Sequence, residues 1–183
     1  MENRFCNPFR VIAGGKALAW GLLFIASVVV LLYAGGCVQD GYIHIGLRPA
    51  GVGLWQTAAM QLLLWLIPAA VLYGCGAVMS HSKIRLIDML GTTAFAQLIL
   101  LPMIAPMLCF DMTQQPFAPA WVVALLGVWE LAWLILFFGW NYAAFATSCN
   151  LRGVKATLTF VAVEVAMVLF SGVLGGWVLQ PHA

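Results

Sequence analysis

Five long apolar stretches dominate this sequence and limit what it can fold into. A helix needs about 20 mostly apolar residues to cross a bilayer, and each stretch reaches that length without a single Lys or Arg. Together they cover most of the 183 residues. The predicted spans are 17–36, 54–79, 86–110, 120–147 and 156–179.

These stretches predict helices rather than strands. They lack the polar/apolar alternation of a membrane barrel, and each is about twice as long as a barrel strand or longer. Lipid-facing backbone has to satisfy its own hydrogen bonds, which a helix does within one segment. The charged fraction is 8 %, against roughly a quarter in soluble domains. We therefore predict an all-α polytopic membrane protein, a single domain 1–183 that forms a bundle of five transmembrane helices.

The basic residues predict the orientation of this bundle. Lys and Arg concentrate in the short cytoplasmic loops beside membrane spans. Of the eight basic residues, only Arg48 falls on the other side of the predicted helices. The N-terminus is therefore expected in the cytoplasm and, after an odd number of spans, the C-terminus is expected outside.

The connections between the spans are short. The longest, 35–53, is rich in turn-forming residues, and its segment 42–45 is expected at the level of the lipid headgroups. Neither this connection nor the Pro-bounded outer loop 111–119 is large enough for a soluble domain. A functional site is therefore expected among the helices or at the short rims.

Two glutamates lie inside predicted spans, Glu130 in the fourth and Glu164 in the fifth. An ionised carboxylate at the centre of a membrane helix costs about 3 kcal/mol or more, and no span supplies a basic partner. Each glutamate is therefore expected to rest protonated unless water reaches it. Helix rise puts Glu130 slightly outward and Glu164 slightly inward of the midplane, with about 10 Å between their depths.

Helical spacing indicates that both glutamates face the bundle interior, because each shares a stripe with other polar or small residues. Three roles remain open for this candidate intramembrane polar site. It forms structural hydrogen bonds between helices, or it relays protons or couples ions, or it binds a lipid headgroup or another partner. Its members are Glu130, Glu164, Asn141, Gln61, Gln97 and Ser171.

The basic residues on the cytoplasmic side also form a candidate rim for anionic lipid. Each Lys or Arg near an anionic surface contributes about 1 kcal/mol of attraction. The alternative is that these charges only determine the topology. The rim consists of Arg10, Lys16, Lys83, Arg85, Arg152 and Lys155.

Cysteine spacing predicts at most one disulfide. Cys37 and Cys109 fall at the outer ends of the first and third helices, and they are the pair that an oxidising exterior would favour. The sequence has no CxxC and no Cys/His spacing suited to zinc, so we expect no metal site and no cofactor.

The sequence carries no recognisable catalytic set. It lacks GxxxxGK[ST], HExxH and GxSxG, and no span holds a histidine or lysine that could act as a base. We therefore expect no enzymatic activity. The small net charge of +2 and the absence of an arginine-rich stripe argue against nucleic acid. The expected partners are membrane lipid, other membrane proteins or a second copy, since Gly172 and Gly176 form a small-xxx-small pair suited to close helix packing.

Three segments resemble the Yip1-domain family of five-helix membrane proteins. They are Asn7-Pro8-Phe9-Arg10 before the first span, Leu101-Pro102-Met103-Ile104-Ala105-Pro106 in the third, and 129–155 across the fourth helix and its inner loop. The eukaryotic Asp-Leu-Tyr-Gly-Pro motif has only a partial counterpart, Leu72-Tyr73-Gly74, without the Asp and the Pro. The resemblance therefore implies a bacterial-type, Yip1-like protein of the cytoplasmic membrane with no established reaction.

Two functional hypotheses follow from the sequence. The first is a non-enzymatic membrane protein that acts through partner or lipid binding. The second is a small proton- or ion-coupled transporter or channel that uses Glu130 and Glu164.

Overall fold

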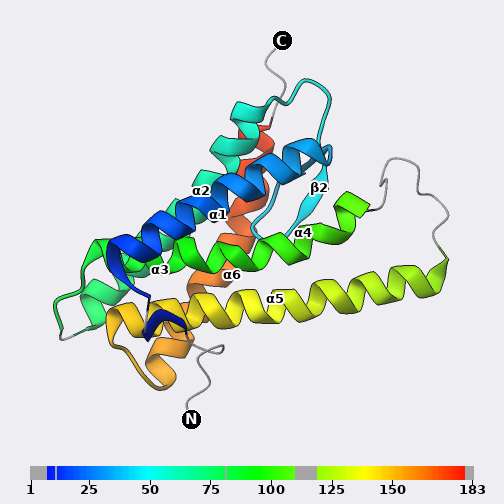
Figure 1. Cartoon of the computed structure of the whole chain (residues 1–183). Coiled ribbons are helices and arrows are strands. Elements are labelled where there is room, and N and C mark those ends of the chain that lie inside the picture. The colour runs from blue at the N-terminus through cyan, green and yellow to red at the C-terminus, as the bar shows by residue number, and fades with distance from the viewer. Residues whose placement is uncertain (1–7, 11, 81, 110–118, 180–183) are drawn as a thin grey trace.

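The five predicted membrane helices are confirmed in the structure, a computed structural model. It describes residues 8–10, 12–80, 82–109 and 119–179, without the side chains of Arg10, Met107 and Cys109. The helices alternate in direction, so α1 begins at one end of the bundle and α6 finishes at the other (Figure 1). The elements in chain order are η1 (Pro8–Arg10), α1 (Gly14–Ala34), β1 (Cys37–Gln39), β2 (Ile45–Leu47), α2 (Leu54–Met79), α3 (Leu86–Ala96), η2 (Gln97–Ile99), α4 (Leu100–Cys109), α5 (Ala120–Cys149) and α6 (Val154–Val178).

The third span differs from the single helix 86–110 that the sequence predicts. It consists of α3, the 3-10 turn η2 and α4, with two prolines in its second half. Pro106 has no N–H to donate to the carbonyl of Pro102 four residues earlier. The indole N–H of Trp129 in α5 donates to that carbonyl at 3.0 Å instead. A backbone acceptor that would otherwise face hydrocarbon is therefore satisfied by a neighbouring helix.

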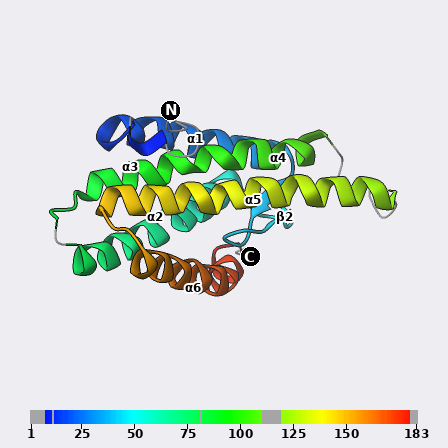
Figure 2. The same ribbon diagram turned by 90° about the horizontal axis from the view of Figure 1, so that it is seen from below.

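Close packing of α1 against α3 holds the first half of the bundle together. The two helices lie side by side in both ribbon views (Figures 1 and 2). A Cβ on Gly91 would lie 2.6 Å from the carbonyl oxygen of Gly14, and one on Gly21 would collide with Ala94. Small residues at a helix interface allow this approach, which supplies van der Waals contact where lipid provides no hydrophobic driving force.

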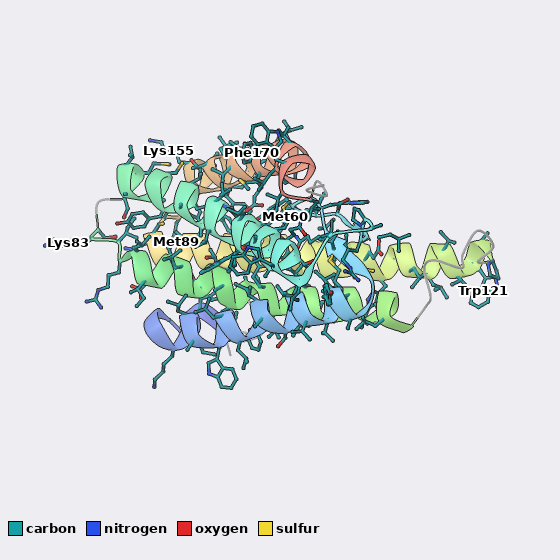
Figure 3. All side chains as sticks on the ribbon, turned by 90° about the horizontal axis from the view of Figure 1, so that it is seen from above. Met60, Lys83, Met89, Trp121, Lys155 and Phe170 are labelled. Carbon is teal, nitrogen blue, oxygen red and sulfur yellow. The ribbon has the colours of Figure 1, made fainter. Side chains whose placement is uncertain are left out.

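The outer half of α5 is the least covered part of the bundle. Val128 is 67 % exposed and Leu131 57 %. Figure 3 places the labelled Trp121 beyond the ends of the other helices, with Lys83 and Lys155 at the opposite end. At 30 residues, α5 is about 45 Å long, which exceeds the roughly 30 Å of a hydrocarbon core. Its first turns therefore project past the bundle.

The connection after α1 forms a β-hairpin that packs among the helices, and its expected place at the level of the lipid headgroups stays a prediction. Strands β1 and β2 pair antiparallel, with Cys37 opposite Leu47 and Gln39 opposite Ile45. Val38 and Tyr42 are both at most 3 % exposed. Strand pairing satisfies the backbone, which makes the insertion possible. We refer to residues 37–47 as the hairpin.

The α1/α3 packing predicts a large effect of a single methyl group. Gly91→Ala should lower the free energy of unfolding by about 1–3 kcal/mol, because the new Cβ meets backbone that must shift. Thermal unfolding in detergent micelles measures this. The matched control is Gly139→Ala in α5, where a Cβ has nothing within 4 Å. That variant should be neutral or slightly stabilised by helix propensity, and equal stability of the two variants would contradict the proposed packing.

Candidate functional site

The hairpin is seated on the outer half of α6. The backbone N–H of Tyr42 donates to the Ser171 hydroxyl at 2.8 Å, and this hydroxyl donates to the Val168 carbonyl at 3.0 Å. One turn further along α6, a Cβ on Gly175 would collide with the backbone carbonyl of Asp40. Gly175 is therefore required by the approach of the hairpin to the helix.

Tyr42 carries the hairpin inward to Glu164. Its hydroxyl donates to Glu164 Oε1 in a long hydrogen bond of 3.4 Å, and its ring packs edge-on against Phe137 of α5. Burial raises the pKa of the Tyr42 phenol well above its usual range, and the hydrogen bond that the phenol donates to Glu164 adds to this. The phenol is therefore neutral and remains a hydrogen-bond donor. A side chain from an outer connection supplies the polar contact that the span itself lacks.

The second oxygen of Glu164 has no hydrogen-bond partner among the described residues. The side chain is only 5 % exposed, so the oxygen is not solvated in compensation. A buried unsatisfied polar atom costs about 1–3 kcal/mol, and in a native structure it points to a missing ligand, water or role.

Glu164 also lines an apolar groove between α5 and α6, which we call the α5/α6 groove. Its volume is about 340 Å³. Val165 is exposed on its wall, so the groove borders the surface where a transmembrane helix meets lipid. The lining residues are Phe138, Phe160, Val161, Glu164, Val165, Val168 and Leu169.

A second hollow, the outer cavity, lies between the hairpin and the last turns of α6. Its volume is about 530 Å³, and it is open where Gly172 and Gly176 bring no side chain. Asp40 Oδ1 and His44 Nδ1 lie 2.6 Å apart at its edge. Val168 lines both this cavity and the α5/α6 groove.

Asp40, His44 and Ser171 all line the outer cavity, and they are the residue types of a hydrolase triad. Their geometry does not fit that chemistry. Ser171 is 2 % exposed, and its hydroxyl proton is directed at the Val168 carbonyl. The His44 side chain is 71 % exposed and is paired with Asp40. The serine is therefore structural, and it anchors the hairpin.

The structure brings together only part of the predicted intramembrane polar site. Gln61 of α2 donates to Gln97 at 3.4 Å, and Asn141 donates to the carbonyl of Phe137 in its own helix. Glu164 and Ser171 meet at the hairpin. Glu130 lies on the less covered outer half of α5 and is partly exposed. It therefore does not share the environment of Glu164.

The basic rim lies at one end of the bundle. The described side chains of Lys16, Lys83, Arg85, Arg152 and Lys155 are all exposed, and Figure 3 shows Lys83 and Lys155 at the same end. The side chain of Arg10 lies outside the described part of the chain. Neither a bound lipid nor a purely topological role follows from this placement, and the anionic-lipid rim stays a prediction.

The structure does not test the predicted Cys37–Cys109 disulfide. Cys37 is a buried free thiol that donates to the carbonyl of Gly35, whereas the side chain of Cys109 lies outside the description. Within the described residues, no group of three or more His, Cys, Asp and Glu side chains could hold a metal ion.

Sequence reasoning missed Asp40, Tyr42 and His44 as site residues. Helical periodicity carries no information about a loop, and the turn-forming residues around this segment suggest a surface connection. The only available signal was the apolar character of Tyr42-Ile43-His44-Ile45, which indicated contact with the membrane but not insertion between helices.

No family model, curated protein or solved structure matches this chain. The resemblance to the Yip1-domain family therefore stays a prediction that depends on the motifs quoted above.

The contact between the hairpin and α6 predicts how fast Cys37 reacts with a thiol reagent. Burial raises the pKa of the Cys37 thiol, and Arg48 opposes this only partly, so little reactive thiolate forms at neutral pH. Gly175→Ala should displace the hairpin, expose Cys37 and speed its alkylation by a membrane-impermeant maleimide by about tenfold. The measurement uses a Cys109→Ser background, so that no other outer cysteine reacts.

Gly176→Ala is the matched control, because a Cβ there has nothing within 4 Å. It should leave the alkylation rate unchanged. If Gly175→Ala reacts no faster than this control, the hairpin does not depend on Gly175.

Proposed function

We propose that this chain is a non-enzymatic integral membrane protein that binds a membrane lipid in the α5/α6 groove, with Glu164 as its polar contact. The observation that carries the proposal is Glu164 Oε2, which is buried, has no partner among the described residues, and belongs to a side chain that lines this groove. We also propose the bacterial cytoplasmic membrane as its location.

The surroundings of Glu164 favour a lipid over a soluble ligand. Apart from Glu164, every lining residue of the groove is apolar. Val161, Val165 and Leu169 are exposed, so the groove opens on the face of α6 that hydrocarbon covers. A lipid chain therefore reaches it by lateral diffusion, while a polar solute would first have to cross the bilayer surface.

Glu164 determines which lipids such a site prefers. A carboxyl in hydrocarbon rests protonated, so Oε2 both accepts and donates hydrogen bonds. A lipid that places a hydroxyl, ester or amide at this depth would satisfy the atom. The Tyr42 hydrogen bond keeps the carboxyl in position.

Filling the groove should weaken lipid binding. Val165→Trp places a large side chain among the lining residues, and lipid retained after mild solubilisation should fall at least about fivefold relative to the wild type. Native mass spectrometry measures the retained lipid. Val173→Trp is the matched control, because Val173 is also exposed on α6 at 61 % but does not line the groove. Equal lipid occupancy in the wild type and Val165→Trp would refute the proposal.

A second candidate function is proton coupling through Glu164. One observation favours it, because the Tyr42 hydroxyl links Glu164 to the hairpin, whose Asp40 and His44 line the outer cavity. These groups suggest a route between the outer surface and the middle of the bundle. The position of Glu130 on the less covered outer half of α5, away from the hairpin contacts of Glu164, argues against a relay in which both glutamates take part.

Reconstituted liposomes with an enclosed pH-sensitive dye separate the two functions. Under proton coupling, Glu164→Gln should abolish proton flux, while Glu130→Gln should leave it near the wild-type rate. Under lipid binding alone, the wild type should show no flux above that of protein-free liposomes. Equal flux in the wild type and Glu164→Gln excludes the coupling function.

A further inference from the structure

The α5/α6 groove and the outer cavity lie on one continuous face of α6. Their lining residues follow helical offsets of three and four along Val161, Val165, Val168, Gly172 and Gly176. Val168 belongs to both hollows. A single long molecule lying along α6 therefore touches both of them.

The dimensions of this face suit a lipid of the outer leaflet. The contact between Gly175 and the Asp40 carbonyl fixes the depth of the hairpin edge. Helix rise puts Val161 about 21 Å below Gly175, which exceeds the roughly 15 Å of one leaflet's hydrocarbon. Gly175 in turn lies about 30 Å from Lys155 at the basic end of the bundle. The outer cavity is therefore at the level of the outer headgroups, and the groove continues to the depth of an acyl chain.

The charges around the outer cavity favour a cation. Asp40 is the only carboxylate among the lining residues, and none of them is Lys or Arg. The cavity also borders the last turn of α6, where the unpaired carbonyls form the negative end of the helix dipole. Arg48, the one basic residue of the connection, is directed elsewhere. It stacks over Tyr33 and donates to the carbonyl of Val52.

The pairing of Asp40 with His44 leaves part of the carboxylate free. His44 Nδ1 lies 2.6 Å from Asp40 Oδ1 and occupies one hydrogen-bonding position of the carboxylate. A carboxylate accepts about four hydrogen bonds, so an ammonium group can bind beside His44. The side chains of Asp40 and His44 are 40 % and 71 % exposed, respectively. A lipid headgroup therefore reaches them without a rearrangement of the protein.

We propose that the ligand of this site is an outer-leaflet lipid with a primary-amine headgroup. Its ammonium binds Asp40 in the outer cavity, and one acyl chain lies in the α5/α6 groove, where a hydroxyl on that chain meets Glu164 Oε2. This inference rests on the proposed lipid-binding function and adds the headgroup class. The basic residues at the opposite end of the bundle do not contact this lipid.

The test compares two lipids with identical chains, phosphatidylethanolamine and phosphatidylglycerol, exchanged into the full-length protein in detergent. Native mass spectrometry should show a preference of about fivefold for phosphatidylethanolamine, as expected for one additional charge pair near a membrane surface. Asp40→Asn should reduce the preference to near unity and retain binding of both lipids, because the groove is unchanged.

Glu130→Gln is the control variant, since it also removes one carboxyl from the outer part of the protein, away from the cavity. It should keep the wild-type preference. Wild-type protein that binds both lipids equally overturns the headgroup assignment and leaves the lipid-binding function standing. Protein that retains neither lipid, or that retains both equally well in Val165→Trp, overturns the proposed function itself.

Soluble ethanolamine serves as a competitor in this test, because it has the same ammonium group as the lipid but no acyl chain. It should not displace the bound phosphatidylethanolamine at equal concentration. Displacement would mean that the cavity binds a free amine and would overturn the assignment to a lipid.

Discussion

The requirement that polar groups find partners inside hydrocarbon governs this structure. Water is absent from the core of a bilayer, so each N–H, carbonyl and carboxyl there depends on a protein neighbour. The Pro102 carbonyl, released by Pro106, is satisfied by Trp129. Glu164 is satisfied at one oxygen by Tyr42. Within the part of the chain that the structure describes, the second oxygen of Glu164 lacks such a partner, as does Gln61 Oε1. Glu164 in addition lines the α5/α6 groove, and this makes its surroundings the candidate site.

The hairpin adds a partly buried, non-helical segment to the bundle of helices. Small residues on α6 allow its backbone to approach, and Ser171 bridges the two through its hydroxyl. As a result, an aqueous-side connection determines the environment of a residue in the middle of a span. The groove and the cavity both follow from this arrangement, because the hairpin covers the outer part of α6 incompletely and Val168 lies where the two hollows meet.

The helices were predictable from the sequence, and the hairpin was not. Apolar length alone locates α2 at Leu54–Met79 as predicted, and the limits of α1, α5 and α6 differ from the predictions by at most three residues. The stripe containing Glu164 and Ser171 was correctly assigned to the interior, since both are at most 5 % exposed. Glu130 has the same local pattern but lies on the less covered half of α5, where α4 is the neighbouring helix. Periodicity identifies a face, whereas only tertiary packing decides whether anything covers it.

The contact between Tyr42 and Glu164 joins segments separated by 122 residues, and this has a consequence for biosynthesis. The ribosome makes the hairpin three spans before α6, so the hairpin waits through the insertion of these spans before the helix on which it packs is made. During that interval Tyr42 and its neighbours have to remain at the membrane surface. The hairpin therefore reaches its final contacts only after α6 is made. A chain truncated before α6 would lack the helix on which the hairpin packs.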